Sequence, residues 1–390
     1  MRLFPPLETE IRRTLEDVPE LIDRVFPLPR RFRAGLPKDV KELSLLLTCS
    51  RGERGESYLG KPSLLSAYLR YFLPWNLYRL CRLLPSLSLS LGDGDAITDL
   101  GCGPLTMPLA LWVSRPDLRT LSLEFRCLDR TGLVLDAGKK LFYALAGDAS
   151  PWGIKIIRAS LDAPVKGPKA ALVSAVNVFN ELFRDLPYTD REGLSSGAAK
   201  SAGILLNLVS ESGSILVVEP GIPRSGEFIA LLRDAFLAYR YAPRLPCPHS
   251  GTCPFPGGKA KWCHFAFETQ DAPPALLKLS AAAGLPKERA TAGFLLAGPQ
   301  DKEASKEASL PARIISDPFP VSAGKRRSGE TFVYGRYACS VQGMILLTGT
   351  RGLIEKQESG RLLRLDCKPP LRRDPKSKAL IVELGSGKKG

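Results

Sequence analysis

The chain has 390 residues, of which 44% are hydrophobic and 24% charged, and 55 Lys and Arg against 40 Asp and Glu give a formal net charge of +15. This length and hydrophobic content suffice for a large core, which excludes a chain that is disordered throughout. The mean hydropathy of -0.04 and the charges or prolines inside every long apolar stretch predict a soluble protein without a membrane-spanning helix.

The positive charge is concentrated at the two ends of the chain. Residues 1–90 carry 15 basic and 10 acidic side chains, residues 91–309 carry 24 and 23, and residues 310–390 carry 16 and 7. A nearly neutral centre between basic flanks favours a polyanionic partner, and nucleic acid is the one that we expect. A solvated basic surface without a partner is the alternative.

The cysteines predict a reducing compartment. Their number is nine, they are scattered, and no signal-peptide pattern precedes them, which argues against a secreted disulfide framework. The N-terminal segment also contains four acidic residues that a transit peptide would avoid: Glu8, Glu10, Glu16 and Asp17. We therefore expect a cytoplasmic protein.

Residues 1–90 are predicted to be helical. Apolar side chains recur there at the spacing of one helix face, as in Leu64, Leu65, Tyr68, Leu69 and Phe72. From Ala96 the pattern changes to short apolar runs with room for a helix between most of them. The predicted strands are 97–100, 124–129, 154–160, 170–179 and 214–220, and 221–240 is predicted to be an amphipathic helix. This alternation indicates a doubly wound, mainly parallel α/β sheet.

The remaining chain divides into three parts. The α/β domain is expected to extend over 91–300 and to contain a Cys-rich insert at 245–265. A polar linker at 299–310 precedes short β-type runs over 311–367, which predict a small antiparallel sheet or barrel. Residues 368–390 are predicted to be a basic, partly disordered tail.

A glycine turn follows the first predicted strand. Gly101 and Gly103 flank Cys102, a helix is predicted from 107 to 113, and Asp129 ends the next strand. Such glycines allow a tight turn close to a ligand, and a carboxylate at the second strand end can accept both hydroxyls of a ribose. An ordinary α/β turn without a ligand is the alternative.

The run Asp99-Leu100-Gly101-Cys102-Gly103-Pro104 resembles the first motif of class I S-adenosylmethionine-dependent methyltransferases. The resemblance implies a Rossmann-like methyltransferase sheet and an S-adenosylmethionine site that includes Asp99, Gly101, Cys102 and Gly103. Asp129 would bind the ribose, and Leu161 and Asp162 would lie near the adenine. Asn177 is a further candidate for the pocket wall. Leu105 replaces the third glycine of the usual motif and is expected to crowd the methionine part of the cofactor.

No catalytic residue is identified from the sequence. The fourth predicted strand ends in Asn177-Val178-Phe179-Asn180, without the Asn/Asp-Pro-Pro-aromatic motif of enzymes that methylate base amines. A cysteine pair at the strand ends, as in cytosine C5 methyltransferases, is also missing. Whether the protein is an enzyme therefore stays open at this point.

The Cys-rich insert predicts a metal centre. Cys247, Cys253 and Cys263 lie in a Gly- and Pro-rich segment that also holds both histidines of the chain, His249 and His264. Three cysteines and a histidine would suffice for zinc, whereas an all-thiolate iron–sulfur cluster needs a fourth cysteine. Cys339 and Cys367 are the candidates for that ligand. The other four, Cys49, Cys81, Cys102 and Cys127, are interpreted as small buried apolar residues.

The same segment resembles a known family. The runs PCPHSGTCP (246–254) and WCHF (262–265), with VVEPGIP (217–223) and YACSVQG (337–343), are similar to methyltransferase-like proteins of the mitochondrial small ribosomal subunit and their bacterial relatives. The resemblance spans roughly residues 57–350. It implies a 4Fe-4S cluster on Cys247, Cys253, Cys263 and Cys339, with the histidines beside it, and small-subunit rRNA as partner during subunit assembly or translation.

Two functions are compatible with these features. The first is an S-adenosylmethionine-dependent methyltransferase-like protein that acts on small-subunit rRNA or binds it. The second is a non-catalytic iron–sulfur assembly factor that binds RNA and methylates nothing. Leu105 and the missing base-handling motif favour the second, and the glycine turn with Asp129 favours the first.

Overall fold

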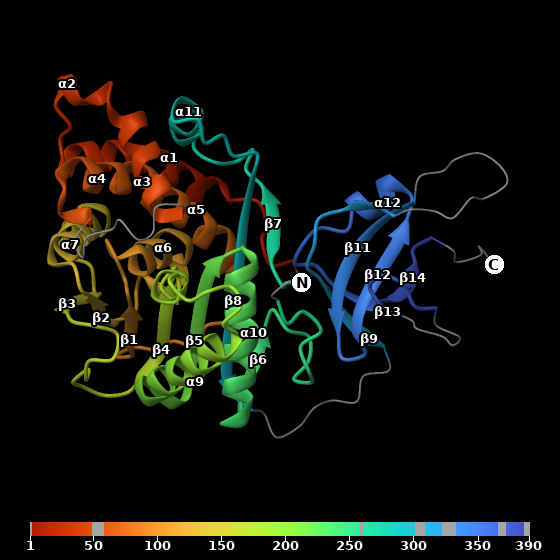
Figure 1. The fold of residues 1–390 in the computed structure, drawn as a ribbon. Helices are drawn as coiled ribbons and strands as arrows, with labels where there is room; N and C mark the ends of the chain where they lie inside the picture. Colours follow the sequence, from red (N-terminus) through yellow and green to blue (C-terminus); the bar gives the residue numbers. More distant parts are fainter. Residues whose placement is uncertain are drawn as a thin grey trace.

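The computed structural model describes residues 2–48, 58–257, 261–300, 309–321, 333–365 and 372–385. These residues form a large eight-stranded sheet with helices on its faces and a separate six-stranded sheet, with the Cys-rich segment between the two (Figure 1). In the described parts of the chain, no helix combines the length and the apolar character that crossing a bilayer requires.

The N-terminal region is helical, as predicted. Pro62 fits in the first turn of α4 because the backbone N–H that it lacks would need no partner within the helix there. The region comprises α1 (Thr9–Val25), α2 (Arg30–Arg33), α3 (Leu36–Thr48), a 3-10 turn (Tyr58–Gly60), α4 (Pro62–Ala67), a π-helical turn (Tyr68–Phe72) and α5 (Leu73–Leu83). The apolar face of α5 is buried against α6, which ties this region to the large sheet.

The large sheet has the strand order β3-β2-β1-β4-β5-β8-β6. Strands β1 to β5 are parallel, β8 is antiparallel to both β5 and β6, and β7 extends the antiparallel edge. The strands are β1 (Ala96–Leu100), β2 (Glu124–Asp129), β3 (Gly153–Arg158), β4 (Ala170–Val176), β5 (Val209–Pro220), β6 (Tyr241–Leu245), β7 (Phe265–Glu268) and β8 (Arg289–Pro299). All five predicted strands are present, and the predicted doubly wound α/β fold is confirmed.

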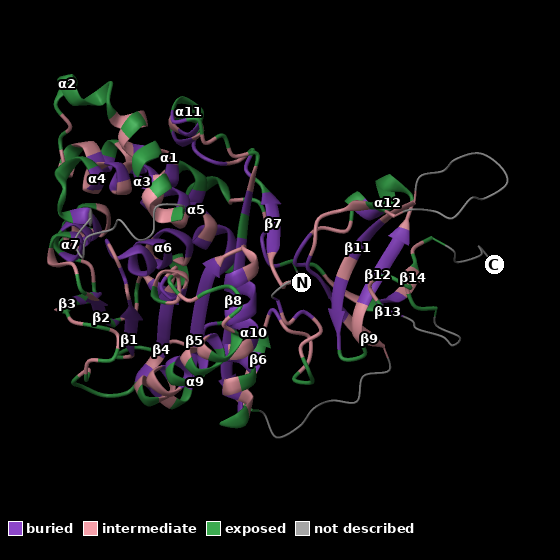
Figure 2. Cartoon of the chain, in the orientation of Figure 1, coloured by how far each residue is buried: buried purple, intermediate pink, exposed green. Residues whose placement is uncertain are grey.

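Helices cover both faces of this sheet, whose central strands are buried (Figure 2). One face packs against α6 (Thr106–Ser114), α7 (Gly132–Ala146) and the N-terminal helices in one apolar core. The opposite face packs against α8 (Phe179–Leu182), α9 (Arg191–Leu208) and α10 (Pro223–Ala238) in a second core. The helix α11 (Pro274–Ala282) joins β7 to β8 and contacts α1 and α3.

The small sheet has the order β13-β9-β11-β12-β14, with β10 paired to β11, and its own apolar core. Its elements are β9 (Leu310–Ile314), β10 (Phe319–Val321), β11 (Val333–Ser340), β12 (Gly343–Gly349), α12 (Arg351–Glu355), β13 (Leu362–Leu365) and β14 (Leu380–Glu383). The last strand lies in the region predicted to be only a basic tail. Its apolar residues Leu380 and Ile381 pair with β12 in parallel, which corrects that prediction for this part of the segment.

Candidate functional site

The glycine turn lies between β1 and α6 and requires glycine at two positions. Gly101 and Gly103 have φ values of +60° and +53°, a region that side-chain-bearing residues avoid. A Cβ atom on Gly101 would also lie 2.6 Å from Cγ2 of Val178, which follows β4. The turn is therefore packed closely against the carboxyl end of the neighbouring strand, where ligands of open α/β sheets bind.

Asp129 ends β2 beside this turn. Its Oδ2 accepts a hydrogen bond of 3.1 Å from the Gly103 N–H, and its Oδ1 accepts one of 2.9 Å from the Thr131 N–H. Each carboxylate oxygen has a second lone pair, so the group can still accept two hydroxyls from a ligand. The structure thus joins the glycine turn to Asp129, and the binding of a ribose there stays a prediction.

Asp99 is buried in β1 beneath the turn. The Ser174 hydroxyl donates a 2.6 Å hydrogen bond to its Oδ1, whereas its Oδ2 has no hydrogen-bond partner. Burial raises the pKa of Asp99 to about 7, the hydrogen bond from Ser174 opposes this, and the negative charge of Asp129 adds to it. The free energy of unfolding should therefore depend on the ionisation of Asp99.

We expect Asp99→Asn to flatten the pH dependence of stability. Between the ordinary pKa of 3.8 and the raised value of about 7, the folded chain binds more protons at Asp99 than the unfolded chain, so wild-type stability falls as pH rises. The advantage of the variant should grow across this window, to on the order of a few kcal/mol, and stay constant above it. Urea unfolding from pH 4 to pH 8.5 measures this, and a constant difference would contradict the assignment.

Leu105, which was expected to crowd the methionine part of a bound cofactor, has its side chain in the core. It adopts a left-handed conformation with φ of +56°, and its side chain is fully buried. A Cβ atom on Gly138 of α7 would lie 2.6 Å from Cδ1 of Leu105, so the leucine packs into the core against that helix. The missing third glycine therefore gives no argument against a cofactor.

The other predicted cofactor residues are less closely gathered. Asn177 follows β4 with φ of +57° and donates its N–H to Val218 O, next to the Val178 that packs on Gly101. Cys102 is buried in the turn and faces Cys127 of β2. Leu161 packs into the second core, and Asp162 is exposed after β3, where its carboxylate accepts a 2.6 Å hydrogen bond from Ser160. Among the described residues, no hydrogen bond joins these last two residues to the glycine turn.

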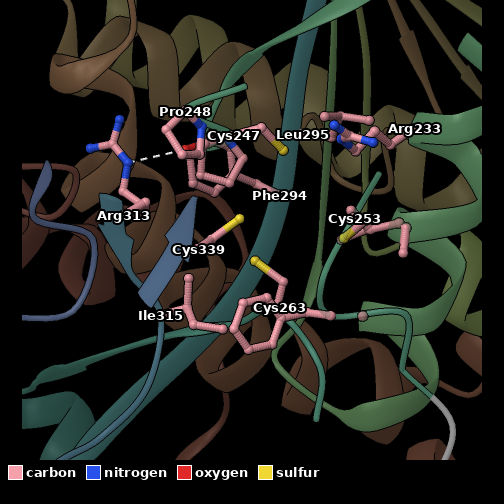
Figure 3. A pocket seen from close by; sticks show the side chains of 15 residues that line it. Arg233, Cys247, Pro248, Cys253, Cys263, Phe294, Leu295, Arg313, Ile315 and Cys339 are labelled. Carbon is pink, nitrogen blue, oxygen red and sulfur yellow. Dashed lines mark hydrogen bonds between the residues drawn. The ribbon is translucent and has the colours of Figure 1, made fainter. Parts of the chain in front are cut away.

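Four cysteines line a cavity that lies between the two sheets. Cys247, Cys253 and Cys263 come from the segment between β6 and β7, and Cys339 comes from β11. The cavity leaves about 20 Å³ that a water-sized sphere can reach, and Figure 3 shows the four sulfur atoms around it. Of the two sequence candidates for the fourth thiol, the structure brings Cys339 to the site, and Cys367 lies outside the described residues.

Two buried arginines flank the four thiols. Arg233 of α10 and Arg313 of β9 are 2% and 3% exposed. Arg233 donates to His249 O at 3.1 Å but its Nε has no partner, and Arg313 donates to Pro246 O at 3.0 Å (Figure 3). The exposed Asp234 is the ion-pair partner of Arg233, at 3.0 Å. Two buried cations beside four thiols suit a site that carries negative charge when its thiols are ionised.

Burial favours the protonated form of each of the four thiols. Burial raises the pKa of all four, to about 11 for Cys253, and in Cys253, Cys263 and Cys339 the neighbouring thiols raise it further. Arg233 lowers the pKa of each. His249 lies 3.3 Å from Cys339 Sγ through its Nε2, and its Nδ1 has no partner. Within the described ranges, no three His, Cys, Asp or Glu side chains converge closely enough to hold a single ion.

Three other cysteines that were interpreted as structural are buried, namely Cys81, Cys102 and Cys127, whereas Cys49 lies outside the described residues. Sequence reasoning missed Arg233 and Arg313, because an arginine on an apolar helix or strand carries no local sign of its partner. It also missed Glu219, which ends β5. That buried carboxylate accepts hydrogen bonds from the N–H groups of Val178, Phe179 and Asn180 and holds the segment after β4.

The strand order, with antiparallel β8 between β5 and β6, and the glycine turn at the end of β1 define a class I methyltransferase fold. A family model described as "Mitochondrial small ribosomal subunit Rsm22" matches residues 194–325, from α9 to the end of the described β10 segment. The match includes three of the four cysteines and confirms the resemblance found in the sequence. A search of curated proteins finds no match.

Solved structures of methyltransferases are similar to the chain at low identity. An S-adenosylmethionine-dependent methyltransferase from Geobacter sulfurreducens in complex with S-adenosyl-L-homocysteine has 14% identity and a TM-score of 0.33, and the match covers 58% of this chain and 91% of that one. Magnesium protoporphyrin IX methyltransferase from Synechocystis PCC 6803 has 10% identity and a TM-score of 0.35, covering 67% and 100%. The ribosomal protein L11 methylase from Lactobacillus delbrueckii has 17% identity and a TM-score of 0.30, and the match covers 43% of this chain and 70% of that one.

Proposed function

We propose that the chain is a methyltransferase-like protein of the small ribosomal subunit that binds S-adenosylmethionine and rRNA and carries a metal cluster between its two sheets. The observation that carries this proposal is the pairing of two sites in one chain: a glycine turn with Asp129 at the ends of β1 and β2, and four cysteines around one cavity. The family match over residues 194–325 supports the ribosomal assignment.

The cofactor site fits S-adenosylmethionine in its donor set. The Asp129 carboxylate would accept the ribose hydroxyls, and the glycine turn lets the backbone approach the ligand. When bound, the cofactor supplies an electrophilic methyl group. The residues of this chain would orient it. No described residue is assigned as the general base that would deprotonate the group that accepts the methyl.

The cysteine cavity fits a 4Fe-4S cluster better than a single zinc ion. Zinc bound by four thiolates holds each sulfur at about 2.3 Å, so the sulfurs must lie about 4 Å apart. Among the described residues, however, no three His, Cys, Asp or Glu side chains converge closely enough to hold one ion. A cluster also carries net negative charge with four thiolates, which Arg233 and Arg313 would offset. The ligands would be Cys247, Cys253, Cys263 and Cys339.

The alternative function is a non-catalytic assembly factor with the same fold, cluster and RNA surface. It is favoured by the segment after β4, where Glu219 holds Val178, Phe179 and Asn180 by their backbone and no base-handling motif is present. Transfer of labelled methyl groups to 30S rRNA tests the choice. Incorporation that depends on the protein establishes catalysis, whereas cofactor binding without incorporation favours the assembly factor.

RNA binding should be strongly salt-dependent. The charge excess of +9 over residues 310–390 would neutralise several phosphates. If about five are neutralised, the logarithm of the binding constant should fall against the logarithm of salt concentration with a slope of about -4 to -5. Filter binding of small-subunit rRNA between 50 and 300 mM KCl, chosen to span roughly the range over which such slopes are resolved, measures it. A flat dependence would contradict the electrostatic contribution.

A further inference from the structure

A further cavity lies where the Cys-rich segment meets the small sheet, and the proposed function does not use it. It holds about 250 Å³ of space that a water-sized sphere can reach, part of it open to solvent, which is slightly less than the sites of drug-sized ligands. Half of its lining residues carry an aromatic ring, and Phe255 and Ile315 line both this cavity and the cysteine cavity. We call it the aromatic pocket, formed by Phe255, Lys261, Trp262, His264, Phe319 and Tyr337.

Two pairs of stacked rings form the walls of the aromatic pocket. Trp262 and His264 lie two residues apart on one extended segment and stack with centroids 4.9 Å apart at 21°. Phe319 and Tyr337 stack with centroids 4.8 Å apart at 30°. Phe319 faces Gly335 across the β10–β11 ladder, so that Tyr337 is its diagonal neighbour on β11.

The charges of the aromatic pocket favour a ligand with a planar ring and an anionic group. The Lys261 ammonium lies 3.7 Å from the Tyr337 ring centroid and donates to its hydroxyl. The Asp317 carboxylate is already paired with Arg289 at 2.5 Å, and Asp374 interacts with Lys261 only through longer-range electrostatics. A cationic ligand would be repelled by the Lys261 ammonium beside the Tyr337 ring, and the Asp317 carboxylate in the wall is already paired with Arg289.

We propose that the aromatic pocket binds one unstacked base of single-stranded RNA, with the ring against the aromatic walls and a phosphate beside Lys261. Bases stack on aromatic side chains regardless of sequence, and a neighbouring cation holds the backbone. The proposal rests on the RNA binding inferred above and adds a defined contact to it. Because the pocket shares two wall residues with the cysteine cavity, its shape depends on how the Cys-rich segment is held.

The test uses the anaerobically purified full chain with its metal and a fluorescein-labelled hexauridylate, followed by anisotropy. Phe319→Ala removes one ring of the wall without touching a cysteine, and we expect it to weaken binding by about five- to thirtyfold. Lys261→Gln should weaken binding and lower the salt slope by about one. Phe32→Ala and Lys278→Gln are matched controls. Phe32 is an exposed ring under Arg31, Lys278 is exposed on α11, and each substitution should change affinity by less than about twofold.

A second measurement uses only the wild-type protein, so it tests the proposal even if a variant folds poorly. Hexanucleotide containing 4-thiouridine is crosslinked to the wild-type protein, and the crosslinked peptides are mapped; we expect them to contain Trp262, Phe319 or Tyr337. Crosslinks elsewhere, or equal affinity of Phe319→Ala and Phe32→Ala, would overturn the pocket. The same holds if hexauridylate does not bind. Binding of structured small-subunit rRNA is measured in parallel, and its absence would overturn the proposed RNA function even if the hexanucleotide binds.

Discussion

Cys339→Ser is expected to abolish the visible absorbance of the anaerobically purified protein. Cys339 is the only one of the four cavity cysteines that comes from the small sheet, where it pairs with Met344 of β12 and Arg313 of β9. A serine hydroxyl is a poor ligand for iron, and with only three thiolates one iron of a four-iron cluster would lack its cysteine ligand. Structural metal sites contribute on the order of 10 kcal/mol to folding, so the loss should be large.

The same substitution should loosen the small sheet from the large one. The three remaining cysteines belong to the segment between β6 and β7, so a bound cluster would link that segment to β11. We expect faster limited proteolysis between the two sheets and a lower melting temperature. Cys81→Ala is the matched control, because Cys81 is equally buried but lies in α5, away from the cavity. Unchanged iron content in Cys339→Ser would remove this residue from the ligand set.

Asp129→Ala is expected to weaken S-adenosylmethionine binding by more than tenfold. The proposed contacts are two hydrogen bonds from ribose hydroxyls to an ionised carboxylate, each of which is worth about 1.5 kcal/mol or more. The substitution also removes the acceptor for the Gly103 N–H, so the turn itself loses one of its supports. Both effects act in the same direction on cofactor affinity.

Isothermal titration measures this affinity, with Asp136→Ala as the control. Asp136 is an exposed carboxylate on α7, the helix that follows Asp129, so it matches the change in charge without touching the turn. Equal affinities of the two variants would remove Asp129 from the site. If the wild-type protein itself shows no binding at millimolar cofactor, the methyltransferase interpretation is wrong and the assembly factor remains.

The two experiments separate the two sites. If the Cys339→Ser variant still binds the cofactor, the glycine turn of the large sheet binds it without help from the cysteine cavity. Loss of both would indicate that the Cys-rich segment also supports the turn, although no direct contact between them is present among the described residues beyond the shared sheet and core.

The sequence alone was sufficient for the parallel strands of the large sheet, but it did not predict its antiparallel strands β6, β7 and β8. Strands β1 to β5 and α10 were predicted because their apolar runs and spacing depend on a few neighbouring residues. The requirement for glycine at 101 and 103 was predictable for the same reason, and the structure adds the left-handed φ values and the contact with Val178. The clustering of Cys247, Cys253 and Cys263 was likewise visible in one short segment.

Only the tertiary structure decided which distant residues meet. It brought Cys339 to the cavity, buried Arg233 and Arg313 beside the thiols, turned Leu105 into the core and paired β14 with β12. It also assembled the aromatic pocket from Trp262 and Tyr337, 75 positions apart in the chain. Such contacts depend on how separate elements pack, and a residue's own neighbours in the sequence carry no record of that packing.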